Sequence, residues 1–188
     1  MANRKTTKKY YFSVEGETEK WYLKWLQDLK KVEVYHFLDY ESDEEIHVKG
    51  FQDALANMKE AQNIGKQITY KSGYSNFTFD LWIILHMMDC NTSYSHRRQY
   101  VTPINRAFDE RFENMEEFKK EADFKRCLGK LQLSNVIDAV GRAKKIMLKN
   151  QENGYILHQY KGYRYYKENP SLMAWEAIEK ILADCKLI

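Results

Sequence analysis

The chain has few of the features that mark secreted or membrane-spanning proteins. Only three of its 188 residues are cysteine, and Cys90, Cys127 and Cys185 are widely spaced without a CxxC pair, which argues against disulfides and against a zinc site. No run approaches the roughly 18 apolar residues that a membrane span needs, and no signal-peptide core follows the N-terminal lysines. The sequence therefore predicts free thiols and a cytoplasmic protein.

Proline is also scarce, and this bounds the domain organisation. The chain has two prolines, no low-complexity linker and no internal repeat, so no domain boundary is marked. A length of 188 residues is enough for one domain with a real core, and an aromatic content of 14% argues against disorder. We expect a single domain over residues 1–188, with a core over about 10–90 and a helical extension over about 91–188.

Short apolar runs alternate with helical patterns in the N-terminal half. Residues 10–14 have strand composition, Gly16 supplies a turn, and the helix predicted next has apolar residues spaced by three and four. A second run, residues 32–38, precedes another helical pattern, and residues 66–72 are a candidate third strand. This order predicts an α/β fold with a small, mostly parallel sheet flanked by helices.

The C-terminal half is predicted to be rich in helices. Residues 77–88 are almost continuously apolar, and a run of that length favours a buried helix over a strand. Ser134 is predicted to cap a further helix. Asn169 and Pro170 are predicted to begin the last helix, with Asn169 as its cap.

Acidic side chains follow the first two predicted strands. Glu15 follows one, and Asp39 and Glu41 follow the other. Because the carboxyl ends of adjacent parallel strands meet in one crevice, these carboxylates are candidate ligands for Mg²⁺ or Mn²⁺. Such an ion binds a phosphate oxygen and stabilises the charge that develops in phosphodiester cleavage. Alternatively, the first acidic group favours a helix N-terminus through the helix dipole, and residues 39–45 form a solvated loop.

Three blocks of the sequence resemble the RloB family of Toprim-related proteins. They are Val14-Glu15-Gly16-Glu17-Thr18-Glu19-Lys20-Trp21-Tyr22, residues 76–86, and Asn169-Pro170-Ser171, in the order that the family has. The resemblance implies a Toprim-like fold in which a glutamate and an Asp-x-Asp motif bind Mg²⁺ and cleave nucleic acid. The matching positions are Glu15 and Asp39-Tyr40-Glu41, where glutamate replaces the second aspartate and a single predicted helix separates the two motifs.

The resemblance also implies a biological setting, and the acidic cluster and the blocks that carry the resemblance supply secondary site candidates. RloB-like proteins are usually encoded in bacterial restriction and phage-defence loci, often beside an ATPase, so a metal-dependent nuclease of anti-phage or abortive-infection defence is expected. The alternative is a shortened, inactive module that binds nucleic acid or a partner ATPase. Secondary site candidates are Glu19, Asp43, Asp80 and His86. For His86, a core histidine is the other interpretation, because it shares a predicted helix face with apolar residues.

A tyrosine- and cation-rich segment near the C-terminus is a candidate nucleic-acid interface. Its aromatic rings can stack on unpaired bases while its cations hold the backbone. The same pattern equally fits a β-hairpin that turns at Gly162, with tyrosines paired across the strands as packing. The candidate partners are therefore DNA or RNA, an ATPase, and a second copy of the chain. The residues expected to bind nucleic acid are Tyr160, Lys161, Tyr163, Arg164 and Lys167.

Overall fold

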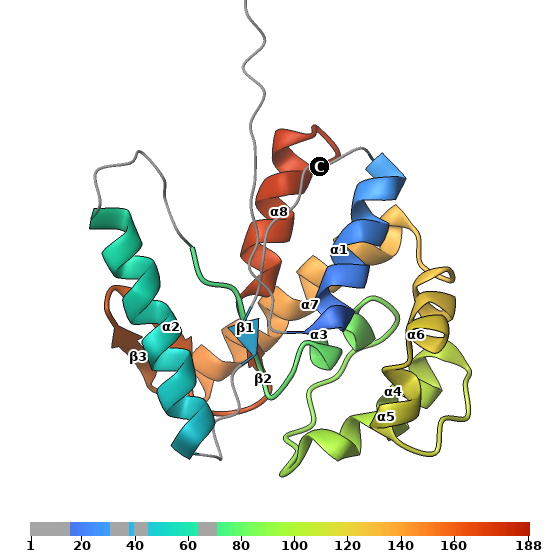
Figure 1. The fold of residues 1–188 in the computed structure, drawn as a ribbon, viewed down its shortest axis with the longest axis horizontal. Coiled ribbons are helices and arrows are strands. Elements are labelled where there is room, and N and C mark those ends of the chain that lie inside the picture. The colour runs from blue at the N-terminus through green and yellow to red at the C-terminus, as the bar shows by residue number, and fades with distance from the viewer. Residues whose placement is uncertain (1–15, 31–37, 40–44, 64–70) are drawn as a thin grey trace, which may run out of the picture.

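Helices make up most of the molecule. The computed structural model describes residues 16–30, 38–39, 45–63 and 71–188, and for residues 26–30 and 38–39 it describes the backbone alone. Of the described residues 61% are helical, and Figure 1 shows these helices around a few short strands. The helices are α1 (Glu17–Lys30), α2 (Glu45–Asn63), α3 (Asp80–Leu85), η1 (Arg97–Tyr100), α4 (Val101–Phe108), α5 (Met115–Phe118), α6 (Glu121–Leu128), α7 (Leu133–Glu152) and α8 (Ala174–Asp184).

The sheet differs from the predicted one, and the expectation of a mostly parallel sheet flanked by helices is wrong. The strands β1 (Leu38–Asp39), β2 (Tyr74–Asn76) and β5 (Ser171–Leu172) have two or three residues each. β1 is parallel to β2, whereas β5 is antiparallel to β2. The reason is that a segment almost a hundred residues further along the chain pairs with the buried strand β2 and satisfies its backbone groups.

The predicted elements correspond to the structure to different degrees. Helix α3 and the residues before it are buried, as the apolar run at 77–88 predicts. The strand predicted over residues 66–72 lies largely outside the described residues, and the observed strand begins at Tyr74. The strand predicted at residues 10–14 also lies outside them. Among the described residues no helix is long and apolar enough to cross a bilayer, and the three cysteines are free thiols.

The last two predicted helix starts are wrong by a few residues. Helix α7 begins at Leu133 with Gln132 as its cap, and α8 begins at Ala174 rather than at Pro170. The side chain of Asn169 does not cap a helix. It accepts a hydrogen bond from the Tyr94 N–H at 2.8 Å and donates one to the Tyr94 carbonyl at 3.0 Å, because the following residues are held in β5.

A large apolar core is centred on α3. All six residues of this helix are buried, and they pack with residues from α1 and from most of the helices between α4 and α8. The side chains of Tyr22, Leu81, Trp82, Ile83 and Ile84 are fully buried. This core therefore joins the N-terminal helix to the C-terminal half, and it fixes the position of the residues at the start of α3.

A second, smaller core lies under α2. Phe51 and Leu55 of α2 pack with Tyr74 of β2 and Tyr165 of the hairpin formed by β3 (Leu157–Tyr160) and β4 (Tyr163–Tyr166). The hairpin is antiparallel, and its two connecting residues have positive φ, 51° at Lys161 and 92° at Gly162. Figure 1 shows α2 and β3 on the same side of the molecule, away from α4 to α6.

Candidate functional site

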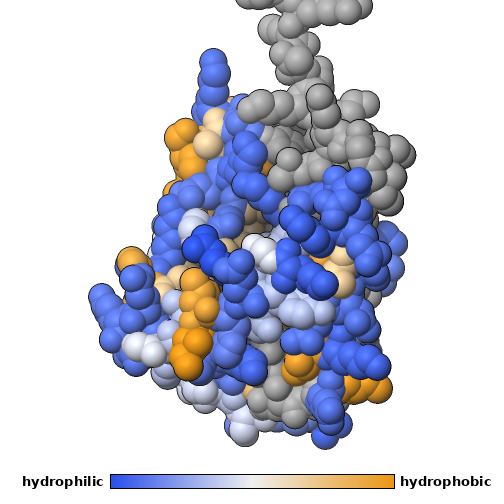
Figure 2. Space-filling model, turned by 90° about the vertical axis from the view of Figure 1, so that its left-hand side faces the viewer, coloured by the Kyte–Doolittle hydropathy of each residue, from blue (hydrophilic) through white to orange (hydrophobic). Residues whose placement is uncertain are grey.

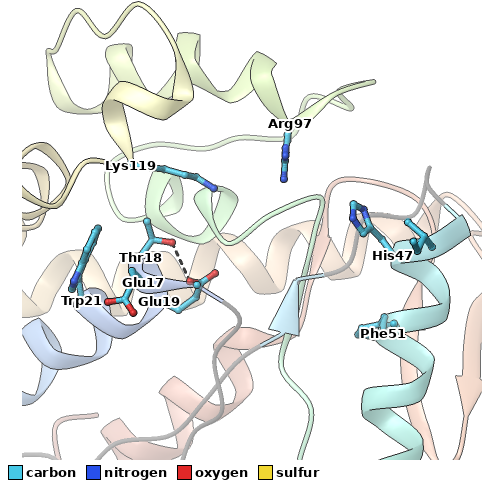
Figure 3. Close-up of a pocket in the computed structure, with 11 residues that line it drawn as sticks. Glu17, Thr18, Glu19, Trp21, His47, Phe51, Arg97 and Lys119 are labelled. Atoms are coloured by element: carbon cyan, nitrogen blue, oxygen red, sulfur yellow. Dashed lines mark hydrogen bonds between the residues drawn. The ribbon is translucent and has the colours of Figure 1, made fainter.

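A pocket of about 400 Å³ lies between the start of α1 and the start of α2. Acidic, basic and aromatic side chains line it together, and Figure 3 shows Lys119 and Arg97 reaching toward it from the opposite side to α1. Its lining residues are Gly16, Glu17, Thr18, Glu19, Trp21, Ile46, His47, Gly50, Phe51, Arg97 and Lys119. Gly16, the first lining residue along the chain, directly follows the predicted ligand Glu15 in the sequence.

Glu19 places a buried carboxyl group in the wall of this pocket. The residue is 3% exposed, and its Oε2 accepts a hydrogen bond from the Thr18 hydroxyl at 3.0 Å. Burial raises the pKa of Glu19 above its usual value, and the nearby charge of Asp80 raises it further, while Lys119 lowers it. A buried carboxyl group with a raised pKa beside a second carboxylate is typical of functional sites.

Asp80 is the second buried carboxylate and begins α3. The residue is 1% exposed, and its Oδ2 accepts a hydrogen bond from the Thr78 hydroxyl at 2.7 Å. The Lys119 ammonium lies 3.2 Å from the same oxygen and is itself about a third exposed, so it joins the buried carboxylate to the pocket. Lys119 therefore forms an ion pair with Asp80, and its charge also lowers the pKa of Glu19. We call Glu19 and Asp80 the acid pair.

The backbone of Gly16 lies directly against the carboxyl group of Glu19. A Cβ atom at this position would lie 2.6 Å from Glu19 Oε2, which is closer than side-chain carbons approach neighbouring atoms. The carboxyl group of Glu19 therefore folds back over the turn that precedes α1. A larger residue in place of Gly16 would push this carboxyl group out of its position, so the glycine and the buried acid form one local unit.

The remaining predicted acidic residues are placed in part. Asp39 ends β1, and its Cα pairs with that of Ser75 in the parallel neighbour β2. The carboxyl ends of both strands therefore point to one edge, and the chain reaches Asp80 four residues after β2 ends at Asn76. The side chain of Asp39 and the whole of Glu15, Glu41 and Asp43 lie outside the described residues. The three principal ligand assignments stay predictions.

The donor chemistry of this region suits a hard cation in part. Carboxylate and hydroxyl oxygens, which Mg²⁺ prefers, are contributed by Glu19, Asp80, Thr18 and Thr78. Within the described ranges no group of three or more His, Cys, Asp or Glu side chains could hold a metal ion. The acid pair therefore fits a metal site only together with further ligands, for which Glu15 and Asp39 are the sequence candidates.

His86 lies in the large core rather than in the pocket. It is fully buried, and its Nδ1 lies 2.8 Å from the Trp82 carbonyl while its Nε2 lies 3.0 Å from the Tyr22 hydroxyl. Because a carbonyl only accepts, Nδ1 carries the proton and Nε2 accepts from Tyr22. Burial lowers the pKa of His86 to about 4, so the ring is neutral near pH 7. Nδ1 is thus satisfied within α3, and Nε2 joins α3 to Tyr22 of α1.

The candidate nucleic-acid segment forms the β3–β4 hairpin. The cations Lys161, Arg164 and Lys167 are exposed, whereas Tyr160 and Tyr163 are half-buried against the smaller core. The hairpin interpretation of this segment is confirmed by its strand pairing. Its cations remain candidates for contact with phosphates, while its tyrosines mainly pack.

Sequence reasoning missed the two cations of the pocket. Lys119 lies close after Glu116 and Glu117 in the sequence, and Arg97 is one of an Arg-Arg pair. Such patterns usually predict charged side chains exposed to solvent. No local pattern connects Lys119 to Asp80, which lies about forty residues earlier. The connection exists because Phe118 is fully buried in the core and carries its neighbour to the start of α3.

Comparison with known proteins gives one match. The model of the family described as RloB-like protein matches residues 31–181, which is most of the chain. No curated protein and no solved structure matches. The matched segment includes Asp39, Asp80, Lys119 and the hairpin, but it begins after the acidic turn and α1.

Proposed function

The chain belongs to the RloB-like protein family, and from this premise we propose that it is a divalent-metal-dependent nuclease that cleaves nucleic-acid phosphodiesters in bacterial defence against phage. The acid pair beside the pocket is the observation that supports the proposal most. Burying two carboxyl groups near a single lysine is costly for stability, because each charged group must lose its water. A binding or catalytic role gives a reason for that cost.

The proposed metal ligands are Glu15, Asp39 and Glu41, and the acid pair supplies two further buried carboxyl groups. Asp80 follows the same sheet edge as Asp39, and Glu19 lies in the first turn of the helix that Glu15 precedes. When bound, the ion supplies Lewis-acid stabilisation of a phosphate oxygen and a bound water of lowered pKa. Arg97 and Lys119 face the same pocket and are placed to attract a phosphate.

A second function is favoured by one contact, the ion pair between Lys119 and Asp80. An ammonium group already offsets the charge of this carboxylate at 3.2 Å, so the pair is satisfied without a metal ion. This arrangement favours the inactive alternative, in which the chain binds nucleic acid or a partner ATPase. The exposed hairpin cations would then carry the binding, as Lys161, Arg164 and Lys167 do not depend on the acid pair.

The deciding experiment is a metal titration on a panel of DNA, RNA and tRNA. The native chain should cleave at least one substrate with Mg²⁺ or Mn²⁺, and Glu15→Gln, Asp39→Asn and Asp80→Asn should each lower the rate by at least about a hundredfold. Glu121→Gln is the matched control, because Glu121 is an exposed carboxylate of α6 that pairs with Lys125. Cleavage that survives Glu15→Gln and Asp39→Asn unchanged would remove the nuclease assignment.

The binding alternative is separated by a second readout on the same proteins. Retention of nucleic acid by the native chain without cleavage at any metal concentration supports the inactive module. In that case the triple substitution of Lys161, Arg164 and Lys167 by Gln should weaken binding and flatten its salt dependence. Asp80→Asn should leave that binding unchanged.

A further inference from the structure

Strand β3 is the outer edge of the hairpin and carries exposed apolar side chains. Over the described part of the chain it pairs with β4 and with no other strand. Ile156, directly before the strand, is 66% exposed, and Leu157 is 42% exposed. Figure 2 faces the side of the molecule that bears α2 and β3, and there apolar patches interrupt a mostly hydrophilic surface. An exposed apolar edge needs a physical explanation.

The hairpin geometry fixes which backbone groups point outward. Because a two-residue turn connects the strands, the flanking pair Tyr160 and Tyr163 exchanges both of its backbone hydrogen bonds. Pairs alternate along an antiparallel ladder, so His158 also directs its N–H and C=O toward β4. The N–H and C=O groups of Leu157 and Gln159 therefore point away from β4. They form a short row of donors and acceptors available to another strand.

This edge lacks the devices that normally prevent strand addition. Residues 155–160 read Tyr-Ile-Leu-His-Gln-Tyr, with no lysine, no acidic residue and no proline. Natural edge strands are usually protected by such residues or by a bulge, and an isolated two-stranded sheet is only marginally stable. The next charged residue, Lys161, lies in the turn beyond the strand. Residues 155–160 would therefore bring no lysine, arginine or carboxylate of their own to a further strand, and pairing would extend the sheet.

We propose that β3 pairs antiparallel with β3 of a second copy of the chain, which forms a four-stranded sheet across a two-fold axis. The strand that fits this edge must be short, extended, uncharged and apolar, and residues 155–160 themselves meet each requirement. Antiparallel self-pairing brings no like charges opposite one another and makes every contact twice. Leu148 of α7, which is 58% exposed and lines the same groove as Leu157, extends the contact surface beyond the strand.

The first test measures mass in solution as a function of concentration. Sedimentation equilibrium should give the native protein twice the chain mass of 22.6 kDa. Gln159→Pro removes one outward N–H without touching the hairpin ladder, and Leu157→Lys places like charges on the edge, so each should weaken the dimer by about tenfold or more. Ile137→Lys is the matched control, because Ile137 is an exposed apolar residue on α7, and it should leave the mass unchanged.

The second test uses the native chain alone and does not depend on how the variants fold. Amide hydrogen exchange of Leu157 and Gln159 should slow as the protein is concentrated, while that of His158 stays the same because its N–H is bonded to β4. A chain that is monomeric throughout the range overturns the proposal and leaves the edge for a strand of another protein. A dimer that both edge variants preserve also overturns it.

Discussion

Replacing Lys119 by methionine tests the electrostatics of the acid pair most directly. The substitution keeps the length and most of the apolar stem of the side chain and removes the ammonium that lies 3.2 Å from Asp80 Oδ2. Asp80 is 1% exposed, and its carboxylate would keep the hydrogen bond that it accepts from the Thr78 hydroxyl. A buried carboxylate would thus lose its counter-charge.

The magnitude follows from the burial of each partner. Removing one partner of a fully buried ion pair costs about 3–5 kcal/mol. Lys119 is 36% exposed and Asp80 keeps a strong hydrogen bond, so we expect about 2–3 kcal/mol in the free energy of unfolding. Asp80→Asn should cost about 1 kcal/mol, because the lysine left behind can reach water. The double variant should then be more stable than Lys119→Met alone.

Urea denaturation at neutral pH, with and without Mg²⁺, measures both the loss and its origin. A metal ion bound next to Asp80 would replace the missing charge, so Mg²⁺ should stabilise Lys119→Met more than the native chain. Lys125→Met, which breaks the exposed pair with Glu121, is the control. The reasoning is refuted if the two lysine variants are equally stable.

Three further predictions concern titration and the hairpin. Burial lowers the pKa of His86 to about 4, so the native chain should lose about 3 kcal/mol of unfolding free energy as the pH falls from 6.5 to 4. His86→Gln should reduce this dependence of stability on pH, as measured by urea denaturation at several pH values. Glu19 has a raised pKa, so Glu19→Gln should raise the melting temperature at neutral pH and lose this advantage in acid; an unchanged difference would contradict the shift. Gly162→Ala should lower the free energy of unfolding by about 1 kcal/mol or more, because φ at this residue is 92°. Gly141→Ala is the control: it lies within α7 where a Cβ atom meets no neighbour, so it should leave the melting temperature unchanged or raise it.

Local patterns predicted the helices well because amphipathic spacing is a local property. The helical pattern after Gly16 corresponds to α1, and the apolar run at 77–88 contains the buried helix α3. The sheet was not predictable in the same way, since β5 has two residues and exists only through its pairing with β2. Two residues are too few to show the alternation of apolar and polar side chains by which a strand is recognised in a sequence.

The candidate site shows the same division between local and distant information. Glu19 and Gly16 belong to one short motif, and their contact is a local consequence of that motif. Lys119 and Asp80 meet only because the helices that carry them pack on a common core. The hairpin was one of two equally weighted alternatives for its segment, and Gly162 was the local signal of its turn.

The two walls of the pocket rest on cores of very different size. The α1 wall belongs to the large core, where some thirty buried residues hold it, while Phe51 on the α2 wall belongs to a cluster of four. The free energy needed to open a part of a protein rises with the apolar surface it buries. The α2 wall should therefore open and reclose many times during the life of the folded state, while the acid pair stays in place. Under the proposed nuclease function, such openings would let an extended nucleic-acid strand enter from the side, without threading a free end.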